Sequence, residues 1–214
     1  MPKVIFVFVI GLATGYFVAG LSDSGIAPQQ EGAYNEPNAV TERSDTDEDD
    51  SDATMQTLTD ARIGLRLQYR TEPNGYGVHA IGSTQESDPA FVKGYQFMLR
   101  SDEEYMKAGE AMEGPATIDV RVFKNPDRLA PGVWATSNPL HSNIELARSD
   151  IEDGEVSGAN AVRYLVDGLY LIETAIIAKG TLIYVVTGGY VSEDDWTYLD
   201  FEAFLNSFEF ISVS

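Results

Sequence analysis

The chain has 214 residues, 43% of them hydrophobic and 11% aromatic, which suits one globular domain with a sizeable core. Its formal net charge of −20 at pH 7 argues against a nucleic acid or an anionic membrane surface as partner, because both would repel it, and favours cationic ligands. The absence of cysteine excludes disulfides, thiol nucleophiles and thiolate metal sites.

Residues 1–21 are predicted to form a signal anchor. Residues 4–21 carry no charge, follow Lys3 and precede an acidic stretch, which is the pattern of an export signal with its positive end inside. As a helix they would span roughly 27 Å, just enough to cross a bilayer. A small-residue cleavage site at Val18-Ala19-Gly20 leaves two outcomes open. The segment stays as a single-pass anchor in the cell membrane with the C-terminal domain outside the cytoplasm, or it is cleaved and the protein is secreted.

Residues 22–60 are predicted to form a disordered acidic spacer. They hold eleven Asp or Glu against one basic residue, Arg43, a self-repelling composition. In the densest part, Asp45–Asp52, carboxylates alternate as in a calcium loop, but Asp50 and Gln56 stand where an EF-hand requires glycine and glutamate. A solvated charge run is the preferred interpretation, and divalent-cation binding by the spacer is a lesser one.

Residues 61–214 are predicted to form the folded domain, and strands alternate with short helices in its first half. Three apolar segments have the pattern of half-buried strands: Leu65–Tyr69, Phe91–Leu99 and Ile118–Val122. Ser101 and Glu104 form a capping box that predicts a short helix after the second strand. Residues 127–140 are interrupted by prolines and are predicted to form a short helix or a wrapped loop.

The second half is predicted to form a meander followed by a covering helix. Three β-rich runs separated by glycines predict antiparallel strands: Ala161–Asp167, Leu169–Ala178 and Thr181–Tyr190. Ser192 and Asp195 form a second capping box, and apolar residues at positions 201, 204, 205 and 208 predict an amphipathic helix that covers the sheet. Phe208–Ile211 is predicted to be the last strand.

The C-terminal residues form a recognisable pattern of glycine-hinged hairpin, tryptophan, helix and aromatic ending. The residues that carry it are Gly158 and Ala161, Gly180, Leu182 and Tyr184 of the run GTLIY, Trp196, and Phe204, Ser207 and Phe208 of the run FLNSFEF. This pattern, over roughly the last 55 residues, resembles the PsbP-like (Mog1/PsbP) superfamily. The resemblance implies an α+β fold, a mainly antiparallel β-sheet covered by helices in an α-β-α sandwich.

The same resemblance implies an extracytoplasmic accessory domain of a kind that is usually not an enzyme. The best-known members help photosystem II to retain its inorganic cofactors. Here the run Glu193-Asp194-Asp195 stands where basic residues are common in the family, and a membrane segment and acidic spacer precede the domain. The resemblance therefore extends to the fold and the broad role, and not to a photosynthetic function.

No catalytic, cofactor or metal site is predicted. The sequence lacks a GxSxG elbow and a complete glycine-rich phosphate loop, and its two histidines have no third ligand at a readable spacing. Acidic pairs such as Asp194-Asp195 are interpreted as stabilisers of helix starts, although two carboxylates that face each other in a cleft could act as acid and base. Trp134, Trp196 and Tyr170 are the candidate partner or ligand surface.

These observations favour a membrane-tethered, extracytoplasmic, non-catalytic binding or assembly module. Its expected partner is a protein or an envelope component, with no nucleic acid and no cofactor. The alternative function is an extracytoplasmic carboxylate-dependent hydrolase.

Overall fold

The computed structural model describes residues 54–82, 88–109 and 114–212. They belong to the second of two compact units into which the chain divides, residues 47–214. The predicted signal anchor, at residues 4–21, lies outside the described residues, as does most of the predicted spacer. Among the described residues, no helix has the length and apolar character needed to cross a membrane.

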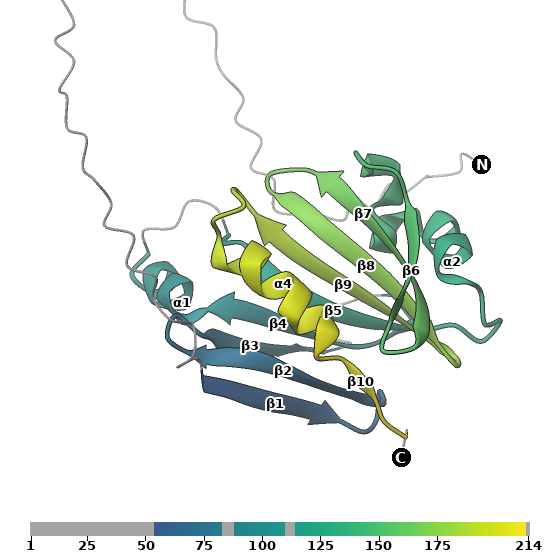
Figure 1. The fold of residues 1–214 in the computed structure, drawn as a ribbon, viewed down its shortest axis with the longest axis horizontal. Coiled ribbons are helices and arrows are strands. Elements are labelled where there is room, and N and C mark those ends of the chain that lie inside the picture. Colours follow the sequence, from purple (N-terminus) through teal and green to yellow (C-terminus); the bar gives the residue numbers. More distant parts are fainter. Residues whose placement is uncertain (1–53, 83–87, 110–113, 213–214) are drawn as a thin grey trace, which may run out of the picture. The chain divides into compact units, whose positions relative to one another are not determined.

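The described residues form two antiparallel β-sheets (Figure 1). The larger sheet has seven strands in the order β3-β4-β5-β9-β8-β7-β6, and the smaller has three in the order β1-β2-β10. Strands of the larger sheet are β3 (Tyr76–Ile81), β4 (Phe91–Leu99), β5 (Thr117–Lys124), β6 (Glu152–Val156), β7 (Ala159–Asp167), β8 (Leu171–Lys179) and β9 (Leu182–Tyr190). Those of the smaller sheet are β1 (Thr54–Asp60), β2 (Leu65–Glu72) and β10 (Glu209–Phe210).

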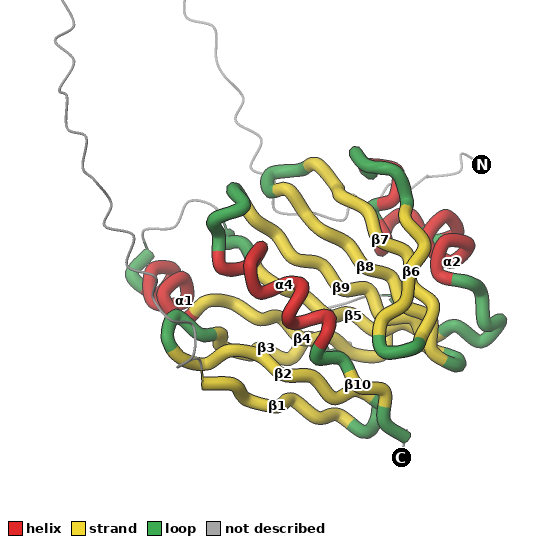
Figure 2. Tube along the Cα trace, in the orientation of Figure 1, coloured by secondary structure: helices red, strands yellow, loops and turns green. Residues whose placement is uncertain are grey.

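Helices pack on both faces of the larger sheet. The helices are α1 (Arg100–Lys107), α2 (Pro131–Ser137), α3 (Pro139–Ser142), the 3-10 helix η2 (Ile144–Leu146) and α4 (Trp196–Asn206). Figure 2 shows α4 lying across the large sheet. On that face Val120 and Leu67 share a core with Phe204 of α4, while Phe123 and Ile176 on the opposite face form a second core with Trp134 of α2. Alternate residues of a strand point to opposite faces, so β5 contributes to both cores. The predicted α+β class, a mainly antiparallel sheet covered by helices, is confirmed.

Segments with clear apolar patterns form the predicted elements. β2, β4, β5, β7, β8 and β9 all occur where strands were predicted, and β7, β8 and β9 form the predicted antiparallel meander. Of the two interpretations of residues 127–140, the helical one is confirmed by α2. The predicted last strand is confirmed only at Glu209–Phe210, and it pairs with β2.

Strands with little apolar alternation were not predicted. β1 lies inside the range assigned to the spacer, and its residues are exposed except near its end, because it is the outer strand of the small sheet. β6, also an edge strand, buries only Val156. β3 buries only Tyr76 fully. An edge strand that leaves both faces in water has no period-two signal to detect.

The ends of the helices also differ from the predictions. α1 begins at Arg100 and ends at Lys107, without a side-chain cap, so the predicted capping box at Ser101 is wrong. α4 ends at Asn206, and Phe208 follows it in the chain. Phe208 is nevertheless 3% exposed and packs beside Phe204, because the chain turns back onto the same core after the helix.

Candidate functional site

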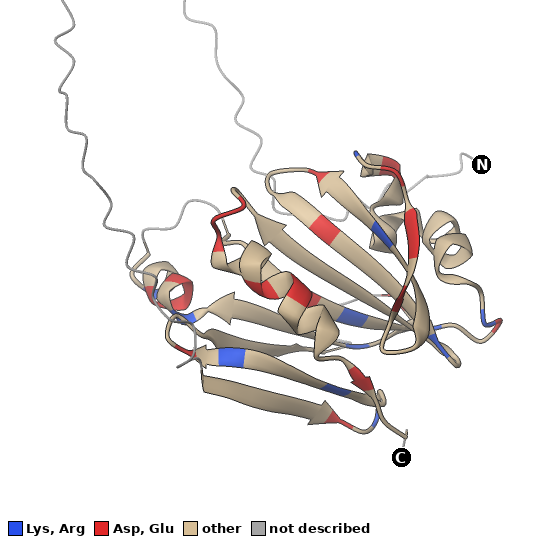
Figure 3. Ribbon diagram, viewed as in Figure 1, with Lys and Arg blue, Asp and Glu red and all other residues tan. Residues whose placement is uncertain are grey.

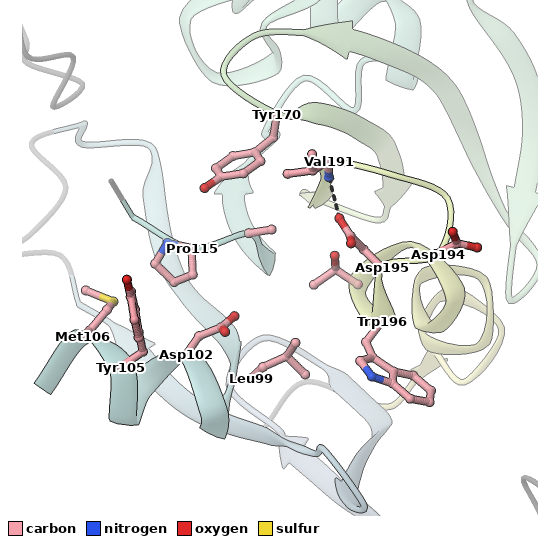
Figure 4. A pocket seen from close by; sticks show the side chains of 12 residues that line it. Leu99, Asp102, Tyr105, Met106, Pro115, Tyr170, Val191, Asp194, Asp195 and Trp196 are labelled. Atoms are coloured by element: carbon pink, nitrogen blue, oxygen red, sulfur yellow. Dashed lines mark hydrogen bonds between the residues drawn. The ribbon is translucent and has the colours of Figure 1, made fainter. Parts of the chain in front are cut away.

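A cavity of about 430 Å³ lies beside the first turns of α1 and α4 (Figure 4). Its walls include Asp102 and Tyr105 of α1, Tyr170 before β8, and Asp195 and Trp196 at the start of α4. These residues come from segments far apart in the sequence, and the antiparallel order of the strands brings them to the same end of the larger sheet. A volume of this size is within the usual range for small-molecule sites.

All of the charged residues that line the cavity are carboxylates. Among the described residues, Asp102, Asp194 and Asp195 line it, and no Lys, Arg or His does. Figure 3 shows acidic residues on α1 and on the loop before α4. The positive ends of the two helices each contribute only about half an elementary charge. The carboxylates outweigh them, so the cavity favours a cation.

Asp102 and Asp195 lie close enough to affect each other. Burial raises the pKa of Asp102 above its ordinary value, and the neighbouring charge of Asp195 raises it further, while a hydrogen bond with Ser101 opposes the change. The charged form of Asp102 is therefore disfavoured in the empty cavity. A bound cation would reverse that effect, because it would stabilise the carboxylate.

Asp195 also braces the loop that leads into α4. Its Oδ2 atom accepts hydrogen bonds from the backbone N–H groups of Val191 at 2.6 Å and Ser192 at 3.1 Å. Asp195 is the N-cap residue of α4, but its side chain makes no cap bond to the helix. The side chains of Ser192 and Asp195 are hydrogen bonded to each other, as predicted. However, these contacts order the loop before α4 and do not cap its first turn, so the predicted capping box is wrong.

Aromatic side chains form much of the remaining wall. Tyr105 is 53% exposed at the rim, and the Tyr170 hydroxyl donates a 2.5 Å hydrogen bond to the carbonyl oxygen of Gly114. The Trp196 ring is stacked on the Arg70 guanidinium, whose Cζ lies 3.9 Å from the ring centre. The wall is therefore both aromatic and held in place by contacts outside the cavity.

Thr197 adds a polar group without a partner. The residue is 2% exposed and lines the cavity, and its Oγ1 atom has no hydrogen-bond partner among the described residues. A buried hydroxyl that makes no hydrogen bond costs about 1–3 kcal/mol. The oxygen is itself shielded from solvent, so Thr197 contributes to the cavity wall without offering a ligand an accessible acceptor.

The three aromatic residues predicted to form a partner or ligand surface, Trp134, Trp196 and Tyr170, do not all lie together. Tyr170 and Trp196 line the same cavity. Trp134 is 4% exposed and packs against Phe123, with ring centres 5.4 Å apart, in the core under α2. It is thus a core residue and not part of a ligand surface. A large apolar indole is more often placed there than on a surface.

Sequence reasoning did not identify Asp102 as a site residue. Asp194 and Asp195 were interpreted mainly as stabilisers of a helix start, with an acid–base pair as the alternative, and Thr197 had no predicted role. No spacing rule connects Asp102 with Asp195, because they become neighbours only when α1 and α4 are placed on the sheet. The acidic run before Trp196 was the only available signal.

The two histidines lie elsewhere, each beside a carboxylate. His79 Nε2 is 2.7 Å from Oε1 of Glu103, and His141 Nε2 is 2.5 Å from Oδ2 of Asp88. Within the described part of the chain, no group of three or more His, Cys, Asp or Glu residues is arranged to hold a metal ion.

No family model matches the sequence, and no curated protein matches it. Among solved structures, the chain is similar to the solution structure of cyanobacterial PsbP (CyanoP) from Synechocystis sp. PCC 6803. The identity is 13%, the TM-score is 0.46, and the match covers 74% of this chain and 93% of that one. The fold class of this chain rests on the strand pairing described above.

Proposed function

We propose that this domain is a non-catalytic binding module that receives a cationic organic group in the cavity between α1 and α4. The observation that carries the proposal is the composition of the cavity wall, in which Asp102, Asp194 and Asp195 are the only charged residues that the structure describes. The net charge of −20 adds a long-range attraction for cations.

The aromatic residues suit an organic cation. A guanidinium or ammonium group gains about 0.5–2 kcal/mol over the face of a Tyr or Trp ring. Tyr105 and Tyr170 place such rings beside the carboxylates, while the Trp196 ring is stacked on Arg70.

Binding accounts for Asp195 better than catalysis does. Its carboxylate accepts two backbone N–H bonds and braces a loop, so it is poorly placed to move a proton to a substrate. A positioned, charged carboxylate of this kind is suited to holding a cation.

The cellular setting of this proposal comes from the sequence. Residues 4–21 would tether the module to the cell membrane, and the acidic spacer would hold the domain outside the cytoplasm. If the signal is cleaved, the same domain would be secreted. Its ligand would then be carried by a protein or an envelope component.

Tryptophan fluorescence tests the proposal directly, because one of the two tryptophans lines the cavity and the other is in the core. The full-length chain with Trp134→Phe, kept in an uncharged maltoside detergent, reports on Trp196 alone. N-acetyl-arginine amide is titrated against its neutral isostere N-acetyl-citrulline amide. We expect a saturable signal with the arginine probe only, weakened about tenfold by Asp102→Asn, the scale of one hydrogen bond to a charged group. An equal response to both probes, or none to either, would refute the proposal.

A carboxylate-dependent hydrolase is the second candidate. One observation favours it: burial and the neighbouring charge of Asp195 raise the pKa of Asp102, and a raised carboxyl pKa is a property of general acids. Turnover of chromogenic ester or glycoside substrates by the full-length chain, abolished by Asp102→Asn with the circular dichroism spectrum intact, would establish this function instead.

A further inference from the structure

We infer that the cation is an arginine or lysine side chain on a polypeptide segment whose neighbouring residues are apolar. This inference rests on the proposed cation site and adds the class of partner. It comes from the rim of the cavity, where Tyr105, Met106 and Val191 are 53%, 43% and 71% exposed. Leu169, next to the cavity residue Tyr170, is 67% exposed.

Strand pairing explains why the rim has two apolar sides. Leu171 of β8 is paired with Tyr190 of β9, so Tyr170 and Val191, one residue beyond each, lie at the same end of the hairpin. Leu169 precedes Tyr170 in the turn that connects β7 to β8. Tyr105 and Met106 belong to α1 and face the cavity from the opposite side (Figure 4). Asp102 lies on α1 beside Tyr105, and Asp194 and Asp195 lie on the segment that leads into α4 (Figure 4).

Such a rim is unusual for a surface that faces only water. The described part of the chain exposes ten large apolar side chains, and three of them, Tyr105, Met106 and Val191, line one acidic cavity. Contiguous exposed apolar residues mark interaction sites more often than isolated ones do. A free amine would fill only the acidic centre and leave the rim in water.

Charge complementarity selects the occupant. Protein interfaces typically have an apolar core with Arg, Tyr and Trp as the residues that contribute most energy. Here Tyr105, Tyr170 and the carboxylates provide the complement of an arginine, and the rim provides the complement of its apolar neighbours. An anionic partner surface would be repelled by Asp102, Asp194 and Asp195.

Four probes separate the centre of the site from its rim. The full-length Trp134→Phe chain is titrated with Ac-Ala-Leu-Arg-Leu-Ala-amide, with the same peptide carrying serines in place of the leucines, with N-acetyl-arginine amide, and with choline. We expect the leucine-flanked peptide to bind about tenfold more tightly than the serine-flanked one, because two partly buried leucines supply that difference. We also expect it to bind more tightly than either small cation.

A rim variant with a matched control completes the test. Met106→Ser combined with Val191→Ser, both at exposed apolar residues of the cavity wall, should reduce the preference for the leucine-flanked peptide to less than about threefold. Leu140→Ser removes a leucine that is even more exposed, 83% exposed on α3, and should leave the preference unchanged. If N-acetyl-arginine amide binds in an Asp102-dependent way but the two peptides bind equally, the inference fails and the cation site stands. The same holds if choline binds as tightly as the leucine-flanked peptide. If none of the cationic probes binds, the proposed function itself fails.

Discussion

The guanidinium of Arg70 lies 3.9 Å from the centre of the Trp196 ring, and its Nη2 atom donates a 2.5 Å hydrogen bond to Oδ2 of Asp200. The Tyr76 hydroxyl donates to the same oxygen at 2.8 Å. Arg70 belongs to β2, while Trp196 and Asp200 belong to α4, so this cluster joins the small sheet to the helix that carries one wall of the cavity. The side chain of Arg70 is 5% exposed, which shields the pair from water.

Replacing Arg70 should therefore affect both stability and binding. Arg70→Ala leaves Asp200 without its cationic partner and should lower the free energy of unfolding by about 3 kcal/mol. It should also weaken the binding of N-acetyl-arginine amide, because the Trp196 indole loses its support. Urea denaturation measures the first effect. Arg66→Ala, on the same strand, breaks an exposed pair with Glu209 and should cost no more than about 1 kcal/mol. Equal losses in the two variants would contradict the structural role given to Arg70.

Removing the charge of Asp102 should weaken binding without weakening the fold. Because the pKa of Asp102 is raised in the folded protein, the folded state binds the proton more tightly than the unfolded state does. Its contribution to stability therefore falls as the pH rises through the raised pKa. At neutral pH, Asp102→Asn should keep the free energy of unfolding unchanged or raise it, while affinity for N-acetyl-arginine amide falls about tenfold. Glu104→Gln, an exposed change on the same helix, should alter neither. A large loss of stability in Asp102→Asn would show that the carboxylate supports the fold.

The affinity for a cation should depend on pH through the same carboxylate. Bound cation favours ionised Asp102, so affinity should rise with pH through the raised pKa and then level off. Carboxyl NMR chemical shifts of Asp102, followed with and without N-acetyl-arginine amide between about pH 3 and pH 8, should report a lower pKa in the bound state. The pH dependence should be flatter in Asp102→Asn. An Asp102 pKa that does not change on binding would place the cation elsewhere.

Asp60 should make the protein sensitive to acid. Burial by itself would raise the pKa of Asp60, but hydrogen bonds from Lys93, Tyr95 and Arg62 together outweigh it and hold the pKa well below its ordinary value. Both Lys93 Nζ and the Tyr95 hydroxyl lie 2.7 Å from its Oδ2 atom. Since the folded pKa lies below the unfolded one, Asp60 stabilises the fold fully above the unfolded pKa and loses that contribution as the pH falls through the folded pKa.

The corresponding variant is Asp60→Asn. It should lower the free energy of unfolding at pH 7 by about 2 kcal/mol, because the partly buried Lys93 loses a hydrogen bond to a charged partner. It should also reduce the loss of stability below about pH 4, where the wild-type carboxylate begins to protonate in the unfolded chain. Asp153→Asn, an exposed change on β6, serves as the control. It should not alter the loss of unfolding free energy at acidic pH. If the wild type and Asp60→Asn lost the same unfolding free energy at acidic pH, the role given to Asp60 in acid sensitivity would be refuted.

Close packing of α4 on β9 should make Gly188 intolerant of a side chain. A Cβ atom at Gly188 would lie 2.5 Å from Cδ2 of Phe201, a buried aromatic ring of α4. Gly188→Ala should lower the free energy of unfolding by about 2 kcal/mol in urea denaturation, since Phe201 must move within a packed core. In Gly154→Ala, on β6, the added Cβ meets nothing within 4 Å, so the change should stay within about 0.5 kcal/mol. A mild effect at Gly188 would mean that α4 packs less closely than the structure indicates.

Most of the strands could be predicted from the sequence, because a strand that is buried on one or both faces has apolar residues in a regular pattern. In β5, Ile118, Val120 and Val122 lie on one face, and this alternation of apolar residues is sufficient to predict the strand. The meander of β7, β8 and β9 follows from three β-rich runs separated by glycines. β1 and β6 were not predicted, because most of their side chains are exposed at the edges of the sheets and show no apolar alternation.

The sequence by itself determined the acidity of the protein, the meander, the covering helix and the aromatic character of the region around Trp196. Only the tertiary structure decided that Trp134 belongs to the core while Trp196 and Tyr170 share a cavity, and that Asp102 meets Asp195 across it. The physical reason is the range of each interaction. Periodic burial acts between near neighbours in the chain, whereas a binding site depends on which distant segments the sheet order brings to one end.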